Sequence, residues 1–141
     1  MIRINEIEEK EIDLLVPIKE DFNKEYKIEK KSKKFILKEF KNYIKKGKIF
    51  IAVIEKKIIG YLAGTIEKNF YESFGYIEEV FVSKNFRKKG ISTELKNSFI
   101  KFLKSKKIKL CRIEVSPKNK AKKVYKKWGF KIEKYRMGLK I

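Results

Sequence analysis

A short basic loop at residues 87–92 has the residue types to bind an anion. It lies between a valine-ended strand pattern and a helical pattern, and it reads Arg87-Lys88-Lys89-Gly90-Ile91-Ser92. The first amides of a helix have no partners inside the helix, and the helix dipole adds about half a positive charge there. Gly90 lets the backbone approach a ligand closely. Since three cationic side chains precede it, this stretch predicts a phosphate site.

The loop lacks the two best-known phosphate signatures. Neither GxxxxGK[ST] nor GxGxxG occurs in the chain. A lysine-rich protein can also show such a basic run by chance. The ligand therefore has to be identified from a second pattern that does not depend on charge.

A helical pattern further along the chain supplies that second feature. It reads Asn119-x-Ala121-x-x-x-Tyr125-x-x-Trp128-Gly129-Phe130. In this order and spacing, the two stretches together resemble the GNAT acyltransferase superfamily. The loop is similar to the R/Q-x-x-G-x-G/A signature of that family. The later stretch is similar to its N-x-x-A-x-x-x-Y-x-x-x-G-F helix with one spacing change, since Asn119 precedes Ala121 by two residues. Ser92 stands where Gly or Ala is usual, but it is small and keeps its amide.

The resemblance implies a coenzyme A site with acetyl-CoA as the acyl donor. The loop amides would hold the diphosphate, and the pantetheine arm would bond to the backbone of the fourth strand. The arm should enter where the fourth and fifth strands separate, between Val82 and Ser116. Lys122 and Lys126 either help to bind the 3′-phosphate or form a solvated helix face. The implied cofactor-binding residues are Val80, Phe81, Val82, Arg87, Lys88, Lys89, Gly90, Ile91, Ser92, Thr93 and Asn119.

The reaction implied by the resemblance is acetyl transfer to a primary amine by direct attack in a ternary complex. The attacking amine must be neutral, and the leaving thiolate needs a proton. Tyr125 is the implied acid, because a phenol with a pKa of about 10 carries its proton at neutral pH. Packing of its ring beneath the sheet is the alternative role for this tyrosine.

Two adjacent glutamates are the candidates for the base and for acceptor binding. Glu78 is preferred as the base, since it matches family members with an acidic pair on this strand, while Glu79 and Tyr76 are assigned to the substrate. Adjacent strand residues face opposite ways, so only one should reach the site unless a bulge intervenes. A solvated carboxylate at the sheet edge is the alternative for each. The acceptor should contact residues 20–35, the 67–76 loop and the C-terminal strand, and a small amine, a peptide N-terminus and a protein lysine all stay open.

The net charge of +20 is concentrated in the second part of the chain. Residues 1–83 hold 17 Lys and Arg against 15 Asp and Glu, whereas residues 84–141 hold 21 against 3. A general preference for lysine explains part of this count, but a polyphosphate cofactor or a nucleic acid would also match it. A nucleic-acid-binding module is therefore one alternative function, although none of the standard binding motifs occurs. A CoA-binding protein without catalysis is the other.

Composition also argues against several kinds of site. The chain has no histidine and one cysteine, Cys111, so we expect no imidazole-based catalysis, no metal site and no internal disulfide. No apolar run is long enough to span a membrane, and acidic residues occupy the place where an export signal needs an apolar stretch. We therefore expect a cytoplasmic protein that does not bind membranes, and a homodimer stays open.

The elements that must position these residues follow from the periodicity of apolar positions. Helices are expected over residues 8–24, with a break at Pro17, and over residues 35–44, 90–107 and 119–128. Strands are expected over residues 1–4, 49–55, 58–67, 75–83, 110–115 and 130–139, with a hairpin at Lys56-Lys57. The late strand–helix–strand unit implies a parallel pair. The chain suits one α/β domain spanning residues 1–141, with a mixed sheet of about six or seven strands and helices on both faces, as in the GNAT fold.

Overall fold

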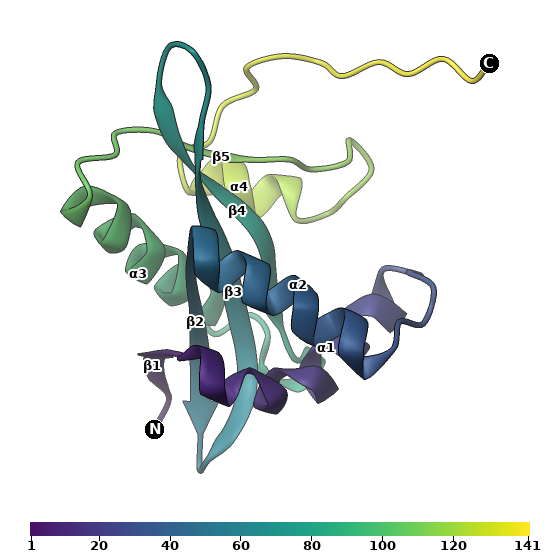
Figure 1. The fold of residues 1–141 in the computed structure, drawn as a ribbon, viewed down its shortest axis with the longest axis vertical. Coiled ribbons are helices and arrows are strands. Elements are labelled where there is room, and N and C mark those ends of the chain that lie inside the picture. The colour runs from purple at the N-terminus through teal and green to yellow at the C-terminus, as the bar shows by residue number, and fades with distance from the viewer.

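The computed structural model describes residues 1–141 and contains one five-stranded mixed sheet. The strands lie in chain order, and neighbours are antiparallel except for the last two, which are parallel. A helix makes the crossover between these two parallel strands (Figure 1). The strands are β1 (Arg3–Glu6), β2 (Gly47–Ile54), β3 (Lys57–Lys68), β4 (Ser73–Val82) and β5 (Cys111–Ile113).

Helices cover both faces of the sheet, as the sequence predicts. Pro17 lies in the first turn of its helix, where the missing N–H costs no hydrogen bond, and a 3-10 helix precedes it. The expected break therefore separates two helices. The helical elements are η1 (Glu9–Leu15), α1 (Val16–Glu25), α2 (Lys33–Lys46), η2 (Lys84–Phe86), α3 (Ile91–Ser105) and α4 (Lys122–Lys127).

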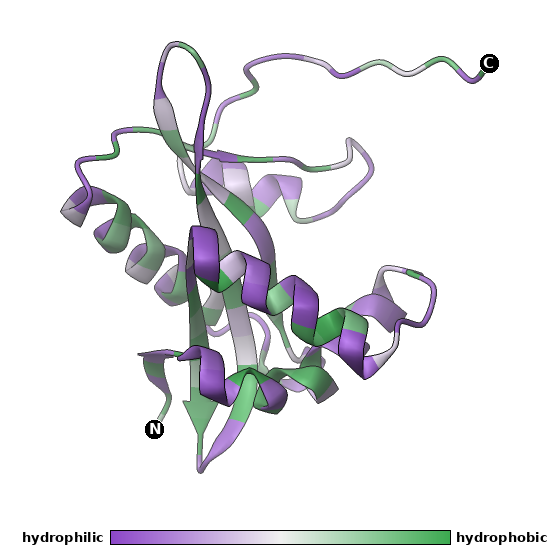
Figure 2. Cartoon of the chain, viewed as in Figure 1, coloured by the Kyte–Doolittle hydropathy of each residue, from purple (hydrophilic) through white to green (hydrophobic).

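Two apolar clusters, one on each face, hold these layers together. The first packs α1 and α2 on the sheet around Tyr61 and Phe40, and both side chains are fully buried. The second packs α3 on the other face around Leu95 and Phe99. In Figure 2, β2 is apolar over most of its length, while the helices alternate between polar and apolar. None of the helices combines the length and the apolar character needed to cross a membrane.

An irregularity in β4 changes which side chains share a face. Ala63 of β3 pairs with Glu79, but the next residue, Gly64, pairs with Ile77. Glu78 is therefore an extra residue opposite β3, which is a β-bulge. Beyond the bulge, β4 also loses its other neighbour, because its pairing with β5 is confined to Gly75–Ile77.

The predicted strand over residues 130–139 is wrong, and the sheet has five strands rather than six or seven. Residues 131–141 are exposed and carry no strand pairing, although their apolar positions alternate. Alternation shows only that a segment can form a strand, whereas a strand also needs a neighbour for its backbone. This segment contacts β5 through side chains alone: Glu133 binds Arg112, and Arg136 binds the following Glu114.

Candidate functional site

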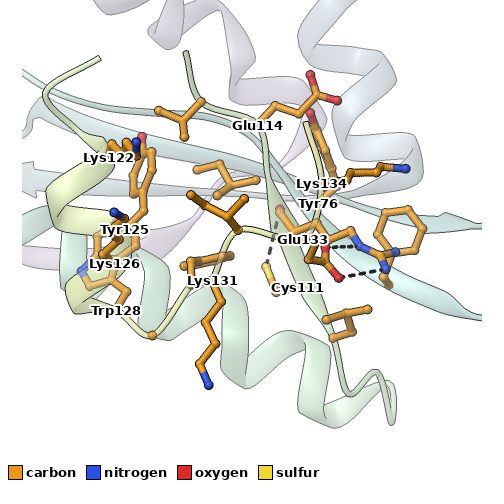
Figure 3. Close-up of a pocket in the computed structure, with 18 of the residues that line it drawn as sticks. Tyr76, Cys111, Glu114, Lys122, Tyr125, Lys126, Trp128, Lys131, Glu133 and Lys134 are labelled. Carbon is orange, nitrogen blue, oxygen red and sulfur yellow. Dashed lines mark hydrogen bonds and ion pairs between the residues drawn. The ribbon is translucent and has the colours of Figure 1, made fainter. Parts of the chain in front are cut away.

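An open crevice of about 1810 Å³ lies along the fifth strand. Its walls come from the edge of β4, from β5 and the loop after it, from α4, and from the C-terminal segment (Figure 3). Several residues singled out in the sequence line it, among them Tyr76, Glu78, Ser116 and Tyr125. The structure thus brings the expected acid and the expected base to one space.

Tyr125 is held by an aromatic cluster at the α4 side of the crevice. Its ring centroid lies 5.4 Å from that of Trp128 and 6.4 Å from that of Phe130. Burial, with a smaller contribution from Tyr26, raises the pKa of Tyr125 to about 12. The hydroxyl therefore keeps its proton throughout the physiological pH range, as a general acid must.

Glu78 has the environment of a carboxylate base. It is half-buried and accepts a hydrogen bond from Thr65 Oγ1 at 3.0 Å. Burial raises the pKa of Glu78 above its ordinary value, while the hydrogen bond from Thr65 lowers it in part. A carboxylate with a raised pKa is a stronger base at neutral pH.

Adjacent strand residues can reach the same space only where a bulge intervenes, and β4 contains such a bulge. Because of it, Glu78 and Glu79 both line a second, smaller cavity of about 250 Å³ that opens between α1, α2 and β4. Glu78 also lines the crevice, but Glu79 does not. Both glutamates therefore border the smaller cavity, but only Glu78 borders the crevice.

Glu79 is buried and fully engaged with other side chains. It is 8% exposed, and it accepts hydrogen bonds from Lys19 Nζ at 2.7 Å, Tyr61 Oη at 2.7 Å and Tyr43 Oη at 3.0 Å. Lys19 Nζ also lies 3.2 Å from Glu39 Oε1. The role of Glu79 in substrate binding stays a prediction, and this carboxylate already has three donors.

The basic loop takes the shape that an anion site needs. Lys88 and Gly90 have positive φ angles of 62° and 78°, so the chain turns sharply into α3. A Cβ added at Gly90 would have no atom within 4 Å, which leaves the space beside the backbone open. The amides of residues 91–93 lie in the first turn of α3 and have no intrahelical partners. Lys88, Lys89 and Gly90 are exposed, so a ligand can reach this turn.

Arg87 lies beside the loop, but its guanidinium already has partners. Nη2 donates to both carboxylate oxygens of Glu25 at 2.8 and 2.9 Å, and Nε donates to the Val82 carbonyl at 2.8 Å. The guanidinium carbon also lies 5.2 Å from the ring centroid of Phe81. Arg87 thus ties the loop to α1 and to the end of β4, and a diphosphate would share it with Glu25.

The backbone of Val80–Val82 pairs with β3 on one side and with no strand on the other. The strands therefore separate after Ile77, in the region where the sequence predicts a slot for the cofactor arm. The cofactor slot between Val82 and Ser116 stays a prediction. Ser116 lines the crevice on the β5 side, and on the β4 side the lining includes Glu78 but not Val80–Val82.

Two hydrogen bonds hold the Asn119–Phe130 motif in place. Trp128 Nε1 donates to Thr93 Oγ1 at 3.0 Å and so links the end of α4 to the first turn of α3. Asn119 Oδ1 accepts from the Ala121 amide at 2.9 Å within the motif and closes a turn just before α4. Thr93 and Asn119, both predicted to bind the cofactor, therefore also have structural contacts.

The other residues singled out in the sequence lie around the crevice. Burial, with a smaller effect of the Glu114 charge, raises the pKa of Tyr76 to about 12. Burial likewise raises the pKa of Cys111 to about 12, which keeps this thiol protonated and unreactive. Lys122 and Lys126 line the crevice from α4 (Figure 3).

Sequence reasoning missed the polar cluster beneath α1 and α2. Lys19 is 4% exposed and Asn23 is 5% exposed. One signal was present: Lys19 follows Leu15 by four residues and precedes Phe22 by three, which places it on the apolar face of a helix. A lysine is almost never fully buried unless it is paired, so this position required a carboxylate partner from elsewhere in the chain.

Comparison with known proteins places the chain in a family. Residues 18–136 match the family model described as an acetyltransferase (GNAT) domain. No curated protein matches the chain.

Solved structures share the fold over nearly the whole chain. A predicted acetyltransferase from Clostridium acetobutylicum, solved with acetyl-CoA, has a TM-score of 0.83 at 23% identity and covers 99% of this chain and 96% of its own. AAC(6′)-Iy, in complex with a bisubstrate analogue, has a TM-score of 0.86 at 15% identity, with 100% and 98% covered. An aminoglycoside acetyltransferase from an uncultured soil metagenomic sample, in complex with sisomicin, has a TM-score of 0.75 at 17% identity, with 99% and 97% covered.

The matched range holds the loop at residues 87–92, Glu78 and Tyr125. The structure places the two side chains at one crevice, beside strands that separate. The chain therefore belongs to the GNAT acetyltransferase family and is an acyltransferase.

Proposed function

We propose that the protein is an N-acetyltransferase that moves the acetyl group of acetyl-CoA to a primary amine by direct attack in a ternary complex. One observation supports this most strongly. β4 parts from β5 after Ile77, and Glu78 and Tyr125 both line the crevice beside that point. A proton acceptor and a proton donor therefore border the same space.

The residues present fit coenzyme A. The first-turn amides of α3 and the exposed Lys88 and Lys89 suit a diphosphate, and the open space at Gly90 admits it. The unpaired backbone edge of Val80–Val82 suits an extended arm that bonds like an added strand. When bound, acetyl-CoA supplies a thioester carbonyl that a neutral amine can attack, with release of the thiol.

In this proposal, Glu78 and Tyr125 account for the two proton transfers of the acetyl-transfer step. As the C–N bond forms and the C–S bond breaks, the Glu78 carboxylate takes the amine proton and Tyr125 gives its phenolic proton to the sulfur. Solvent then returns a proton from Glu78 to Tyr125. A phenol with a pKa of about 12 is a weak acid for a thiolate whose thiol has a pKa of about 8.5. We therefore expect Tyr125 to contribute near the lower end of the usual range of about 10²–10⁴-fold.

The acceptor in this proposal is a small-molecule amine. Sisomicin occupies one of the related structures, and a bisubstrate analogue of CoA and acetylneamine occupies another, which supports this class of acceptor. Glu79 and Tyr76 stay assigned to the acceptor side, with Tyr76 in the crevice and Glu79 in the smaller cavity.

Calorimetry and turnover together test the proposal. Purified protein should bind CoA and should release thiol from acetyl-CoA in the presence of a primary amine. Tyr125→Phe should lower kcat by about 10²-fold while leaving the Kd of CoA within about twofold, because only the proton donor is removed.

Ser105→Ala is the control, because it also removes one hydroxyl but lies exposed at the end of α3, outside both cavities. It should change neither kcat nor the Kd of CoA. Absence of heat with both CoA and acetyl-CoA, on folded protein, would refute the proposed function.

A further inference from the structure

The cavity of about 250 Å³ between α1, α2 and β4 contains polar groups that the proposed chemistry does not use. Asn23 lines it from α1, Glu39 lines it from α2, and Glu79 lines it from β4. Lys19 and the ring of Phe22 complete this part of the wall. The volume lies just below the range of about 300–1,000 Å³ that is usual for a whole small-molecule ligand. The cavity therefore suits one arm of a ligand.

Two buried oxygens in this cavity make no hydrogen bond. Asn23 is 5% exposed, and its Oδ1 has no hydrogen bond. Glu39 Oε1 is also buried without a hydrogen bond, although it forms an ion pair with Lys19 Nζ at 3.2 Å. Buried polar atoms in folded proteins nearly always have partners. Both atoms are acceptors, so each can accept a hydrogen bond from an N–H or an O–H group.

The charges around the cavity favour a cation as that partner. Lys19 is shared between Glu79, at 2.7 Å, and Glu39, at 3.2 Å, so these three groups carry a net negative charge. Glu78 adds a further carboxylate at the wall. The remaining cation, Lys31, lies 4.0 Å from Glu29 and over the ring of Phe35. An ammonium group has three donors and no acceptor, which matches both the unpaired oxygens and the charge.

Glu78 lines both the cavity and the crevice. We infer that the cavity binds a protonated amino group of an acceptor that carries at least two amines. A second, neutral amine of the same molecule then lies at Glu78, where it accepts the acetyl group. The part of this inference that concerns the reacting amine rests on the proposed function. The binding of an ammonium group in the cavity is independent of it.

A pair of amines that differ by one ammonium group tests the inference. We expect 1,4-diaminobutane to bind at least about tenfold more tightly than butylamine, and to be acetylated with a kcat/KM at least about tenfold higher. Glu39→Gln keeps the shape of the side chain but removes its charge, so it should abolish both preferences. Asn23→Leu removes the carbonyl acceptor at similar volume and should weaken binding of the diamine alone.

Matched substitutions on the exposed sides of the same helices serve as controls. Glu20→Gln on α1 and Asn42→Leu on α2 lie outside the cavity and should leave the preference unchanged. Circular dichroism and CoA titration of each variant show whether it is folded.

The outcomes separate this inference from the proposed function. Equal dissociation constants for the two amines would overturn the inference, whether or not turnover is seen, and so would a preference that survives Glu39→Gln. Preferential binding of the diamine without thiol release from acetyl-CoA would support the ammonium site and overturn the proposed function instead.

Discussion

Glu78 and Glu79 show how two identical neighbours acquire different chemistry. Glu79 accepts hydrogen bonds from Lys19, Tyr43 and Tyr61, so its carboxylate oxygens are occupied by three donors. Glu78 has one hydrogen bond, from Thr65, and burial raises its pKa. A base must take up and release a proton during each cycle, and the partly exposed position of Glu78 beside the crevice supports its proposed role as that base.

The hydrogen bond from Thr65 to Glu78 should determine the pH at which kcat/KM falls on the acidic side. The proposed base, Glu78, can take a proton only when it is deprotonated, so kcat/KM should fall as the pH drops through its raised pKa. The Thr65 hydroxyl lowers that pKa, and Thr65→Val should therefore raise it further and move the acidic limb to higher pH. On the acidic side, kcat/KM should drop by up to about tenfold, as expected for loss of a hydrogen bond to a charged group.

Steady-state kinetics across the acidic range check this shift. The same substitution in a Glu78→Gln background should cause no further movement, since the titrating carboxylate is gone. A Thr65→Val profile that overlays the wild-type profile would show that another group controls the limb.

At the scale of elements, the site depends on how closely α3 packs against β3 and β4. Gly64 of β3 lies at the bulge, paired with Ile77, and a Cβ there would overlap the ring of Phe99 on α3. Gly75 of β4 has the same relation to Leu103. These small residues let α3 lie against the sheet, which brings its first turn to the open edge of β4.

Gly64→Ala should therefore lower the free energy of unfolding by about 1–3 kcal/mol, the usual cost of overpacking a core. Urea denaturation followed by circular dichroism measures this change. Gly138→Ala is the control, because a Cβ at Gly138 meets no atom within 4 Å. If the two variants unfold at the same urea concentration, the close approach of Phe99 to Gly64 is not a structural constraint.

The periodicity of apolar residues predicted most of the helices and strands, but the strand expected over residues 130–139 does not form. The hairpin expected at Lys56-Lys57 forms with a turn at Glu55 and Lys56, both of which have positive φ. Hairpins and helices depend on residues close in sequence, so periodicity and turn chemistry suffice to find them. The strand expected over residues 130–139 depended on a distant backbone neighbour, and no local signal reports whether such a neighbour exists.

At the scale of the whole molecule, the basic second half of the chain should strengthen binding of an anionic cofactor. The Debye length is about 10 Å at 0.1 M salt, so exposed charges act mainly on ligands close to them. Raising NaCl from about 0.05 M to about 0.5 M should weaken CoA binding by about tenfold. Calorimetry at the two salt concentrations measures this effect.

Reversing one charge at each end of α3 shows whether CoA binding depends on charges near the loop or on the net charge of the protein. Lys89→Glu, next to the first turn of α3, should weaken CoA binding, whereas Lys104→Glu, in the last turn, should not. Equal effects of both variants would show that net charge, and not the loop, controls binding. Strong binding of a polynucleotide that CoA does not compete away would instead favour the nucleic-acid alternative.

The sequence by itself determined the family and predicted an anion loop and the residue types at the crevice, because motifs and periodicity are local properties of the chain. It also favoured Glu78 over Glu79 as the base, but it could not show whether a bulge lets both side chains reach one site. Only the tertiary structure decided which glutamate reaches the crevice, that Arg87 is shared with Glu25, and that Lys19 and Asn23 border a second cavity. Each of these facts joins residues far apart in the chain, and such pairs form when the elements pack.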